Sequence, residues 1–365
     1  MEKELPYYLG FSFFLGIGPV RFLALMRKFS SVKEAYFANN DQLAAILGEN
    51  LTERFIQFRN NFNPEKELEK LMKKKISIVP LGSLLYPKLL SSISDPPICL
   101  YIKGDLNLFR EVEEKKKNFF AIVGTRKPTS YGQEIARYFS FQLASAGFVI
   151  VSGMAMGIDA IAHQQALKAG EKTVAVLGCG VDIIYPKINE RLYDEIVDGG
   201  GIVVSEFPPG HLVKKGLFVA RNRLISGLSK GVLVVEGQAD SGALITARYA
   251  ADQGREVYAP PAPLTSSMAQ APLILLKQGA KLVTSPQDIL EDMGLTFKSK
   301  KGKKVEGELT PFEKEIYQAL QSEGKTADDL ALELSKDLTT ILNQLSLMEI
   351  KAIVSKKEDG KYYLV

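Results

Sequence analysis

Short apolar segments alternate with helical segments between residue 76 and about residue 295, and this alternation constrains the fold more than any other feature of the chain. The clearest apolar runs are residues 119–123, 148–151, 173–177, 202–205, 232–235 and 256–259. The clearest helical patterns are residues 131–146, 159–169, 189–197, 242–254 and 272–278. β-branched strands separated by amphipathic helices predict an α/β domain over residues 76–296, with a Rossmann-like, doubly wound, mostly parallel sheet covered on both faces. Ligands of such a sheet bind beyond the carboxyl ends of the strands.

Residues 1–75 are predicted to be helical. The sequence Gly16-Ile17-Gly18-Pro19 separates two apolar helical patterns, as in a helix-hairpin-helix or SAM-like domain. Such a turn can present backbone N–H groups to a phosphate; the alternative is a tight helix–helix turn in which glycine is needed only for steric reasons. The uncharged segment 7–20 contains three glycines and lacks a positively charged leader, so we expect a cytoplasmic protein with no membrane partner.

The C-terminal part is predicted to contain a lysine-rich linker and a winged-helix domain. Residues 298–304 carry five lysines within the predicted linker 297–307, which indicates a solvated tether or a non-specific phosphate contact. In the winged-helix domain, residues 308–365, we expect helices at 311–321, 326–334 and 338–348 and a hairpin at 352–364. This domain has seven Lys against eleven Asp and Glu, and its third helix has no Lys or Arg. A helix without cations gains little from releasing DNA counterions, so a protein contact or a structural role is predicted.

The composition excludes several kinds of site. Two cysteines and two histidines argue against a disulfide scaffold and against a Cys-rich or His-rich metal centre. The net charge of +4 means that any surface for nucleic acid is local. No Walker sequence occurs, and the one Gly-x-Gly after a predicted strand, at Gly178 and Gly180, lacks the third glycine of a dinucleotide fingerprint. No cofactor is expected. His163 is interpreted as a helix-surface or capping group.

Two strand-to-helix turns are candidates for phosphate binding. Residues 151–160, Val-Ser-Gly-Met-Ala-Met-Gly-Ile-Asp-Ala, join the strand at 148–151 to the next helix, and Gly124-Thr125-Arg126-Lys127 follows the preceding strand. Turns rich in Ser and Gly expose N–H groups at the positive end of a helix dipole, which favours phosphate. Ser152 and the backbone of Gly153 are the expected donors.

Cations and aromatic rings follow the same strand ends. Arg126 has a planar guanidinium that can bind phosphate in a bidentate manner. Tyr185-Pro186-Lys187 places a ring beside a cation, and Phe218 precedes Arg221-Asn222-Arg223. Cations with nearby rings for base stacking are what a single-stranded nucleic acid requires. Glu206 and Glu236 are expected on the same rim, where they would orient the arginines or bind ribose-like hydroxyl groups.

The whole sequence resembles the bacterial DNA-processing protein A family, also called Smf. The resemblance rests on an ordered series of motifs: Tyr86-Pro87, Asp95-Pro96-Pro97, Ile122-Val123-Gly124-Thr125-Arg126, Val151-Ser152-Gly153, Gly157-Ile158-Asp159, Tyr185-Pro186, Ser205-Glu206-Phe207-Pro208-Pro209-Gly210, Arg221-Asn222-Arg223-Leu224-Ile225-Ser226-Gly227 and Ser241-Gly242-Ala243-Leu244-Ile245-Thr246-Ala247.

The resemblance implies a non-catalytic recombination mediator of natural transformation (competence). Members bind incoming single-stranded DNA, protect it, form homodimers through the Rossmann-like domain and load RecA recombinase. By motif match, the implied DNA-binding residues are Gly124, Arg126, Ser152, Gly153, Lys187, Phe218, Arg221, Asn222 and Arg223.

The sequence departs from the family pattern at four places. Met156 stands where a basic residue is frequent, and Val219 replaces a proline. Pro261-Ala262 stands in place of a Pro-Gly turn, and Ala271-Pro272-Leu273 in place of a Gly-x-Asn. The alternatives to DNA binding are a nucleotide-binding enzyme or sensor that uses the turn at 152–159, and an interaction scaffold built on the acidic C-terminal domain.

Overall fold

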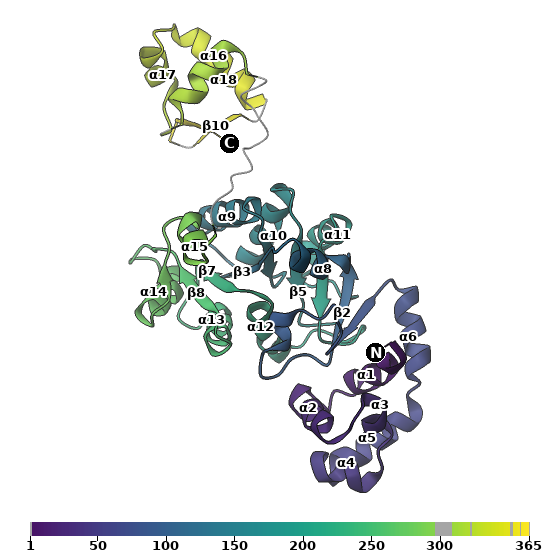
Figure 1. The fold of residues 1–365 in the computed structure, drawn as a ribbon. Helices are drawn as coiled ribbons and strands as arrows, with labels where there is room; N and C mark the ends of the chain where they lie inside the picture. The colour runs from purple at the N-terminus through teal and green to yellow at the C-terminus, as the bar shows by residue number, and fades with distance from the viewer. Residues whose placement is uncertain (1, 296–308, 322, 351–352, 358, 365) are drawn as a thin grey trace. The chain divides into compact units, whose positions relative to one another are not determined.

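The chain forms two compact units in this computed structural model, Met1–Phe297 and Lys298–Val365 (Figure 1). The structure describes residues 2–295, 309–321, 323–350, 353–357 and 359–364. The predicted boundary near residue 75 therefore falls inside the first unit, and the predicted linker 297–307 lies outside the described residues. None of the helices in the described ranges is both long and apolar enough to cross a bilayer.

A mostly parallel sheet organises the first unit. Its strand order is β1-β2-β6-β5-β4-β3-β7-β8-β9. The strands are β1 Ser77–Pro80, β2 Cys99–Gly104, β3 Phe119–Val123, β4 Val149–Ser152, β5 Thr173–Val176, β6 Ile202–Ser205, β7 Gly231–Val234, β8 Glu256–Ala259 and β9 Lys281–Leu282. The strands from β6 to β9 in this order pair in parallel, whereas β2 pairs antiparallel with β1 and with β6. Successive strands β4, β5 and β6 are added on one side of β3, and β7, β8 and β9 are added on its other side. Rossmann-like sheets bind ligands at such a switch point, which here lies between β3 and β7.

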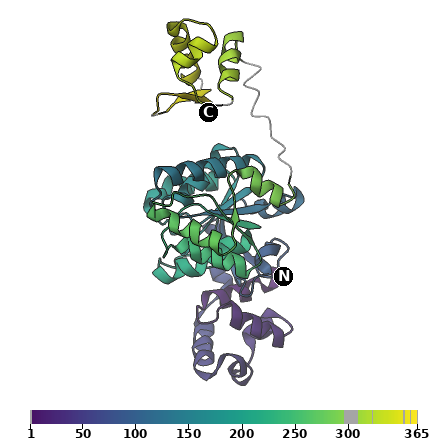
Figure 2. The same cartoon turned by 90° about the vertical axis from the view of Figure 1, so that its left-hand side faces the viewer.

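Helices cover both faces of this sheet (Figures 1 and 2). They are α7 Lys88–Ser91, α8 Asn107–Glu114, α9 Ser130–Ser145, α10 Ile158–Lys168, α11 Glu190–Asp198, α12 Lys215–Leu228, α13 Gly242–Asp252, α14 Gln270–Lys277 and α15 Pro286–Asp292. Alternation along β3 explains the two layers, because successive side chains of a strand point to opposite faces. Ala121 and Val123 pack with α12 and α13, while Phe120 and Ile122 pack with α9 and α10.

Six helices precede the sheet: α1 Leu5–Phe13, α2 Pro19–Lys28, α3 Val32–Phe37, α4 Asn40–Leu47, α5 Glu49–Asn61 and α6 Pro64–Lys73. Their aromatic core includes Cys99 and Tyr101 of β2, which point away from the main sheet core. The hydroxyl of Tyr101 donates a hydrogen bond of 2.9 Å to the Ser12 hydroxyl. The helical region is therefore continuous with the sheet through β2, which lies between β1 and β6.

The second unit contains α16 Pro311–Ala319, α17 Ala327–Glu333, α18 Leu338–Ile350 and the antiparallel pair β10 Val354–Lys356 and β11 Tyr362–Leu364. The three helices and the hairpin lie where the sequence analysis places them. Each of α16 and α17 begins at a threonine that forms a capping box with the acidic residue three positions later. The winged-helix assignment stays a prediction.

The main prediction for the fold is confirmed, since the sheet is mostly parallel and covered by helices. Several elements lie outside the predicted ranges, among them α7, α8, α15 and β9. Residues 215–228 form α12 although no helix is predicted there, and β1 and β2 extend the sheet as an antiparallel edge.

Candidate nucleic-acid interface

Four chain segments meet at the carboxyl ends of the parallel strands and enclose a small pocket. They are the loops that follow β3, β4 and β5, together with the first half of α12. The lining residues are Arg126, Gly153, Ala155, Met156, Tyr185, Pro186, Phe218 and Arg221. The structure therefore brings together Arg126, Gly153, Phe218 and Arg221 of the predicted site, and Lys187 follows two residues after Tyr185. We call the surface formed by these segments the rim.

Arg126 and two aromatic rings form the exposed part of the rim. The Arg126 guanidinium carbon lies 5.6 Å from the centre of the Phe218 ring, a cation–π arrangement. The ring of Tyr185 lies 5.5 Å from that of Phe218, centre to centre, with a tilt of 36°. Arg126 is exposed, and Tyr185 keeps 42% of its surface accessible. An exposed cation and an exposed ring thus lie beside the half-buried ring of Phe218.

Glu236 anchors the loop that carries Arg126. Its backbone carbonyl accepts a hydrogen bond of 2.8 Å from the Thr125 N–H. Its carboxylate accepts from the Thr129 N–H at 2.9 Å and from the Thr129 hydroxyl at 2.6 Å. Because Glu236 is buried after β7, both ends of the loop are fixed to the sheet. This role differs from the predicted contact with arginines or hydroxyl groups of a ligand.

The turn between β4 and α10 already contains an internal carboxyl group. The Asp159 carboxylate accepts hydrogen bonds from the backbone N–H of Ala155, at 3.3 Å, and of Gly153. Asp159 is buried, and this burial raises its pKa, although the nearby Arg221 acts in the opposite direction. The N–H groups of Gly153 and Ala155 are therefore bonded within the chain.

Ser152 and Asn189 also stabilise the turn between β4 and α10. Ser152 is fully buried, and its hydroxyl donates to the Ile122 carbonyl at 2.6 Å. Asn189 donates to the carbonyl groups of Met154, at 2.8 Å, and Ala155, at 3.3 Å. Sequence reasoning missed Asn189, whose only signal is its position just before α11. The predicted DNA contact of Ser152 stays a prediction, and the structure shows its hydroxyl directed inward.

Arg221 lines the pocket but binds the protein itself. Its guanidinium donates to the carbonyl groups of Gly153, at 2.6 Å, and Val176. Only 5% of its surface is exposed, and burial lowers its pKa to about 10, partly offset by Asp159. A Cβ at residue 153 would lie 2.6 Å from the guanidinium nitrogens, so a larger residue there would displace the Arg221 guanidinium. Arg221 therefore ties α12 to the ends of β4 and β5.

The remaining predicted residues are held by other partners. Arg223 is buried between carboxylates, with its Nε 2.9 Å from Asp95 and its Nη2 bonded to Glu206. Asn222 donates to the Gly242 carbonyl at 3.2 Å. Lys187 is exposed and lies 2.7 Å from the Glu190 carboxylate.

Gly124 packs closely against α10. A Cβ on this residue would lie 2.7 Å from the side chain of Ile158. The DNA-binding roles of Gly124, Lys187, Asn222 and Arg223 stay predictions.

His163 corrects one expectation. The imidazole is fully buried rather than on a helix surface. Because the Thr173 hydroxyl donates to the Ile150 carbonyl at 2.7 Å, its oxygen accepts from His163 Nδ1 at 2.8 Å. Burial and the charge of Arg221 lower the pKa of His163 to about 3. Among the described residues, no three His, Cys, Asp or Glu side chains form a group that could hold a metal ion.

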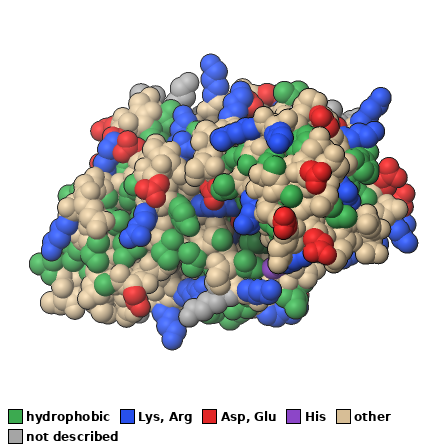
Figure 3. Space-filling view, turned by 90° about the horizontal axis from the view of Figure 1, so that it is seen from below, with side chains coloured by type: hydrophobic (Ala, Val, Ile, Leu, Met, Phe, Trp, Pro, Cys, Tyr) green, Lys and Arg blue, Asp and Glu red, His purple; other side chains and the backbone are tan. Residues whose placement is uncertain are grey.

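The face on the side of the helical N-terminal region carries mixed charge. Seen from the side of the helical N-terminal region, Lys and Arg side chains are scattered among acidic and apolar ones (Figure 3). This view agrees with the small net charge of the chain. A nucleic acid would therefore depend on the local arrangement at the rim.

Comparisons with known proteins show the family of this chain. The family model described as DNA recombination-mediator protein A matches residues 77–294. Protein Smf from Synechocystis is 39% identical over 295 residues, which cover 80% of this chain and 73% of the relative. The DNA processing protein DprA of Bacillus subtilis is 43% identical over 218 residues, 60% of this chain and 71% of the relative.

Two solved structures are similar as well. The X-ray structure of DNA processing protein A from Streptococcus pneumoniae has a TM-score of 0.68 and 35% identity, and the match covers 78% of this chain and 96% of that one. The Helicobacter pylori protein, described by its single-stranded DNA binding mode, has a TM-score of 0.53 and 32% identity, with coverage of 60% and 95%. The chain belongs to the DNA recombination-mediator protein A family.

Proposed function

We propose that this chain binds single-stranded DNA at the rim and acts, without catalysis, as a recombination mediator in natural transformation. The observation that carries the proposal is the exposed Arg126 guanidinium on the Phe218 ring, beside Tyr185. Arg126 supplies charge for a phosphate, and the rings supply surfaces on which bases can stack. In a duplex the base faces are already stacked on each other, so this combination favours an unpaired strand. The Helicobacter pylori relative, a single-stranded DNA-binding protein by its description, supports the same substrate.

Protection of incoming DNA, loading of RecA and formation of homodimers extend this proposal. Their support is membership in the family of recombination mediators. The absence of catalysis is proposed because the described rim residues are cations, rings and bonded backbone groups rather than an exposed nucleophile beside a base.

The test is a fluorescence-anisotropy titration of labelled oligo-dT at several salt concentrations. We expect Arg126→Ala and Lys187→Ala each to weaken binding and to reduce the slope of log K against log salt by roughly one unit or less, because each removes one phosphate contact. Phe218→Ala should weaken binding by about 1–3 kcal/mol for each stacked base, with little change in slope. Arg191→Ala is the matched control, because Arg191 is exposed on α11 and does not line the pocket.

Unchanged affinity in both Arg126→Ala and Phe218→Ala would contradict the assignment of the rim. Thermal stabilisation by free nucleotides in preference to oligo-dT would instead favour the nucleotide sensor. The internal Asp159 carboxylate argues against that alternative, because it already accepts hydrogen bonds from the turn a free phosphate would use.

A further inference from the structure

An apolar cavity of about 380 Å³ opens at the amino ends of β3 and β7, the edge of the sheet opposite the rim. Phe119, the first residue of β3, and Lys230, just before β7, both line it. The other walls come from the segment around α7, from α8 and from Leu295. All of these residues belong to the first unit.

The interior of the cavity is apolar. Phe109, Val112 and Leu228 form buried walls and belong to the main sheet core, while Leu85 and Leu89 are half-buried at the opening. The hydroxyl of Tyr86, which also lines the cavity, already donates to the Pro97 carbonyl at 2.9 Å. Pockets for polar small molecules carry polar groups placed to orient the ligand. This interior instead suits a bulky apolar side chain.

The edge of the cavity is cationic. Lysines 88, 116, 117 and 230 line it, against the single acidic side chain of Glu113. Lys88 pairs with Glu113, and Lys117 lies 2.6 Å from Glu171. Lys116 and Lys230 are exposed, and neither has an ion pair with a described residue. Two uncompensated positive charges therefore stand beside an apolar opening.

The end of α8 fixes the backbone at Lys116. Lys117 N–H donates to the Val112 carbonyl at 2.9 Å, and Lys116 N–H donates to the Glu113 carbonyl at 3.2 Å. Lys116 has a φ of +51°, which completes a Schellman-type helix end. The cationic side of the opening is thus built on a defined turn.

We propose that this cavity is a docking site for an acidic peptide segment of a partner protein, which inserts one bulky apolar side chain. An apolar anchor in a desolvated pocket supplies most of the affinity of such contacts, and complementary charge around it supplies specificity and association rate. The proposal goes beyond DNA binding and does not rest on it, because the cavity and the rim share no residue.

The experiment measures fluorescence anisotropy with labelled acidic nonapeptides that carry Phe, Leu or Ile at the centre, and with the same peptide carrying Ala there. At least one apolar peptide should bind the full chain saturably, and at least tenfold more tightly than the Ala peptide. Lys116→Glu with Lys230→Glu should weaken this binding at least tenfold. The matched control is Lys66→Glu with Lys73→Glu on α6. It makes the same change in net charge at two lysines that do not line the cavity. Leu85→Asp, at the half-buried opening, should also abolish binding.

Oligo-dT binding is measured on the same variants and should stay unchanged, so a failure of the rim and a failure of the cavity are distinguishable. The proposal is overturned if none of the apolar peptides binds, or if both double variants weaken peptide binding equally. Peptide binding that appears only in the Phe297→Ser variant would also overturn the proposal. The occupant of the cavity would then be Phe297, the next apolar residue of this chain after Leu295.

Discussion

The arginines of the rim differ in what their guanidinium groups contact. Arg126 is exposed and lies on an aromatic ring, whereas Arg221 donates to two backbone carbonyls and Arg223 pairs with two carboxylates. Removing Arg221 would leave buried carbonyl groups without donors, which costs roughly 1–3 kcal/mol for each group. Among these three arginines, only Arg126 can be substituted to report on a ligand without also disturbing the fold.

Buried His163 predicts a specific acid sensitivity. Its folded-state pKa of about 3 lies below the ordinary value of 6.5, so only the unfolded chain takes up this proton as the pH falls between these values. The contribution of neutral His163 to the free energy of unfolding is therefore fully present above pH 6.5. It is lost as the pH falls, by at most about 1.4 kcal/mol per pH unit. His163→Gln should have a flatter pH dependence of the unfolding free energy between pH 6.5 and 4, as measured by urea denaturation. Equal slopes for the variant and the wild type would show that the imidazole is not neutral in the folded chain.

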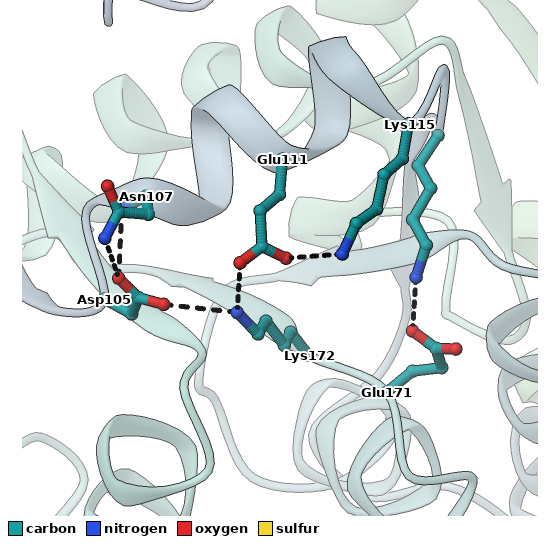
Figure 4. A network of polar contacts seen from close by, with 7 residues as sticks. Asp105, Asn107, Glu111, Lys115, Glu171 and Lys172 are labelled. Carbon is teal, nitrogen blue, oxygen red and sulfur yellow. Dashed lines mark hydrogen bonds and ion pairs between the residues drawn. The ribbon is translucent and has the colours of Figure 1, made fainter.

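At the scale of elements, a network of charges joins α8 to the start of β5 (Figure 4). Lys172 lies 3.2 Å from Asp105 and 3.1 Å from Glu111, and Lys115 also reaches Glu111. Hydrogen bonds and the charge of Lys172 lower the pKa of both carboxyl groups, although partial burial opposes this for Asp105, and the two carboxylates raise the pKa of Lys172.

Lys172→Met should therefore destabilise the chain at neutral pH. The carboxylates contribute stability above their ordinary pKa values, and this contribution is lost as the pH falls through their lowered folded-state values. The free energy of unfolding should fall by about 1 kcal/mol or less in the variant, because the charged groups are partly exposed. This difference from the wild type should shrink with acidification. Urea denaturation at neutral and at acidic pH checks this. Lys115→Met is the control, because Lys115 is 61% exposed with a single longer contact, and its variant should change stability less.

The sequence predicts the parallel strands and their helices because β-branched runs such as β6 and β7 have few other ways to be buried. It also predicts that Arg126 and Phe218 lie at one edge, since parallel strands end together. It does not predict that Ser152, Arg221 and Arg223 turn inward, because direction depends on partners distant in the chain, such as Ile122 and Asp95. Helix α12 is missed because Gly216 and the Arg-Asn-Arg sequence weaken its apolar pattern.

At the scale of the whole molecule, the helical N-terminal region and the sheet share a core, and the C-terminal residues form a separate unit. Calorimetry of the full chain should therefore resolve two unfolding transitions. Tyr101→Phe removes the hydrogen bond to Ser12, which is worth about 1 kcal/mol, and should lower the midpoint of the larger transition by roughly 2 °C. The smaller transition should not move. A third transition that alone responds to Tyr101→Phe would mean that residues 1–75 unfold independently.

The rim and the apolar cavity lie at opposite ends of the short strand β3. Four or five residues at about 3.3 Å each separate the two openings by roughly 15 Å along β3. A macromolecule at one end leaves the other end accessible, and the rigid sheet keeps the two at a fixed spacing. The consequence is tethering. A partner that docks in the cavity is held close to the DNA bound at the rim, at a high effective concentration, without any change of shape in the protein.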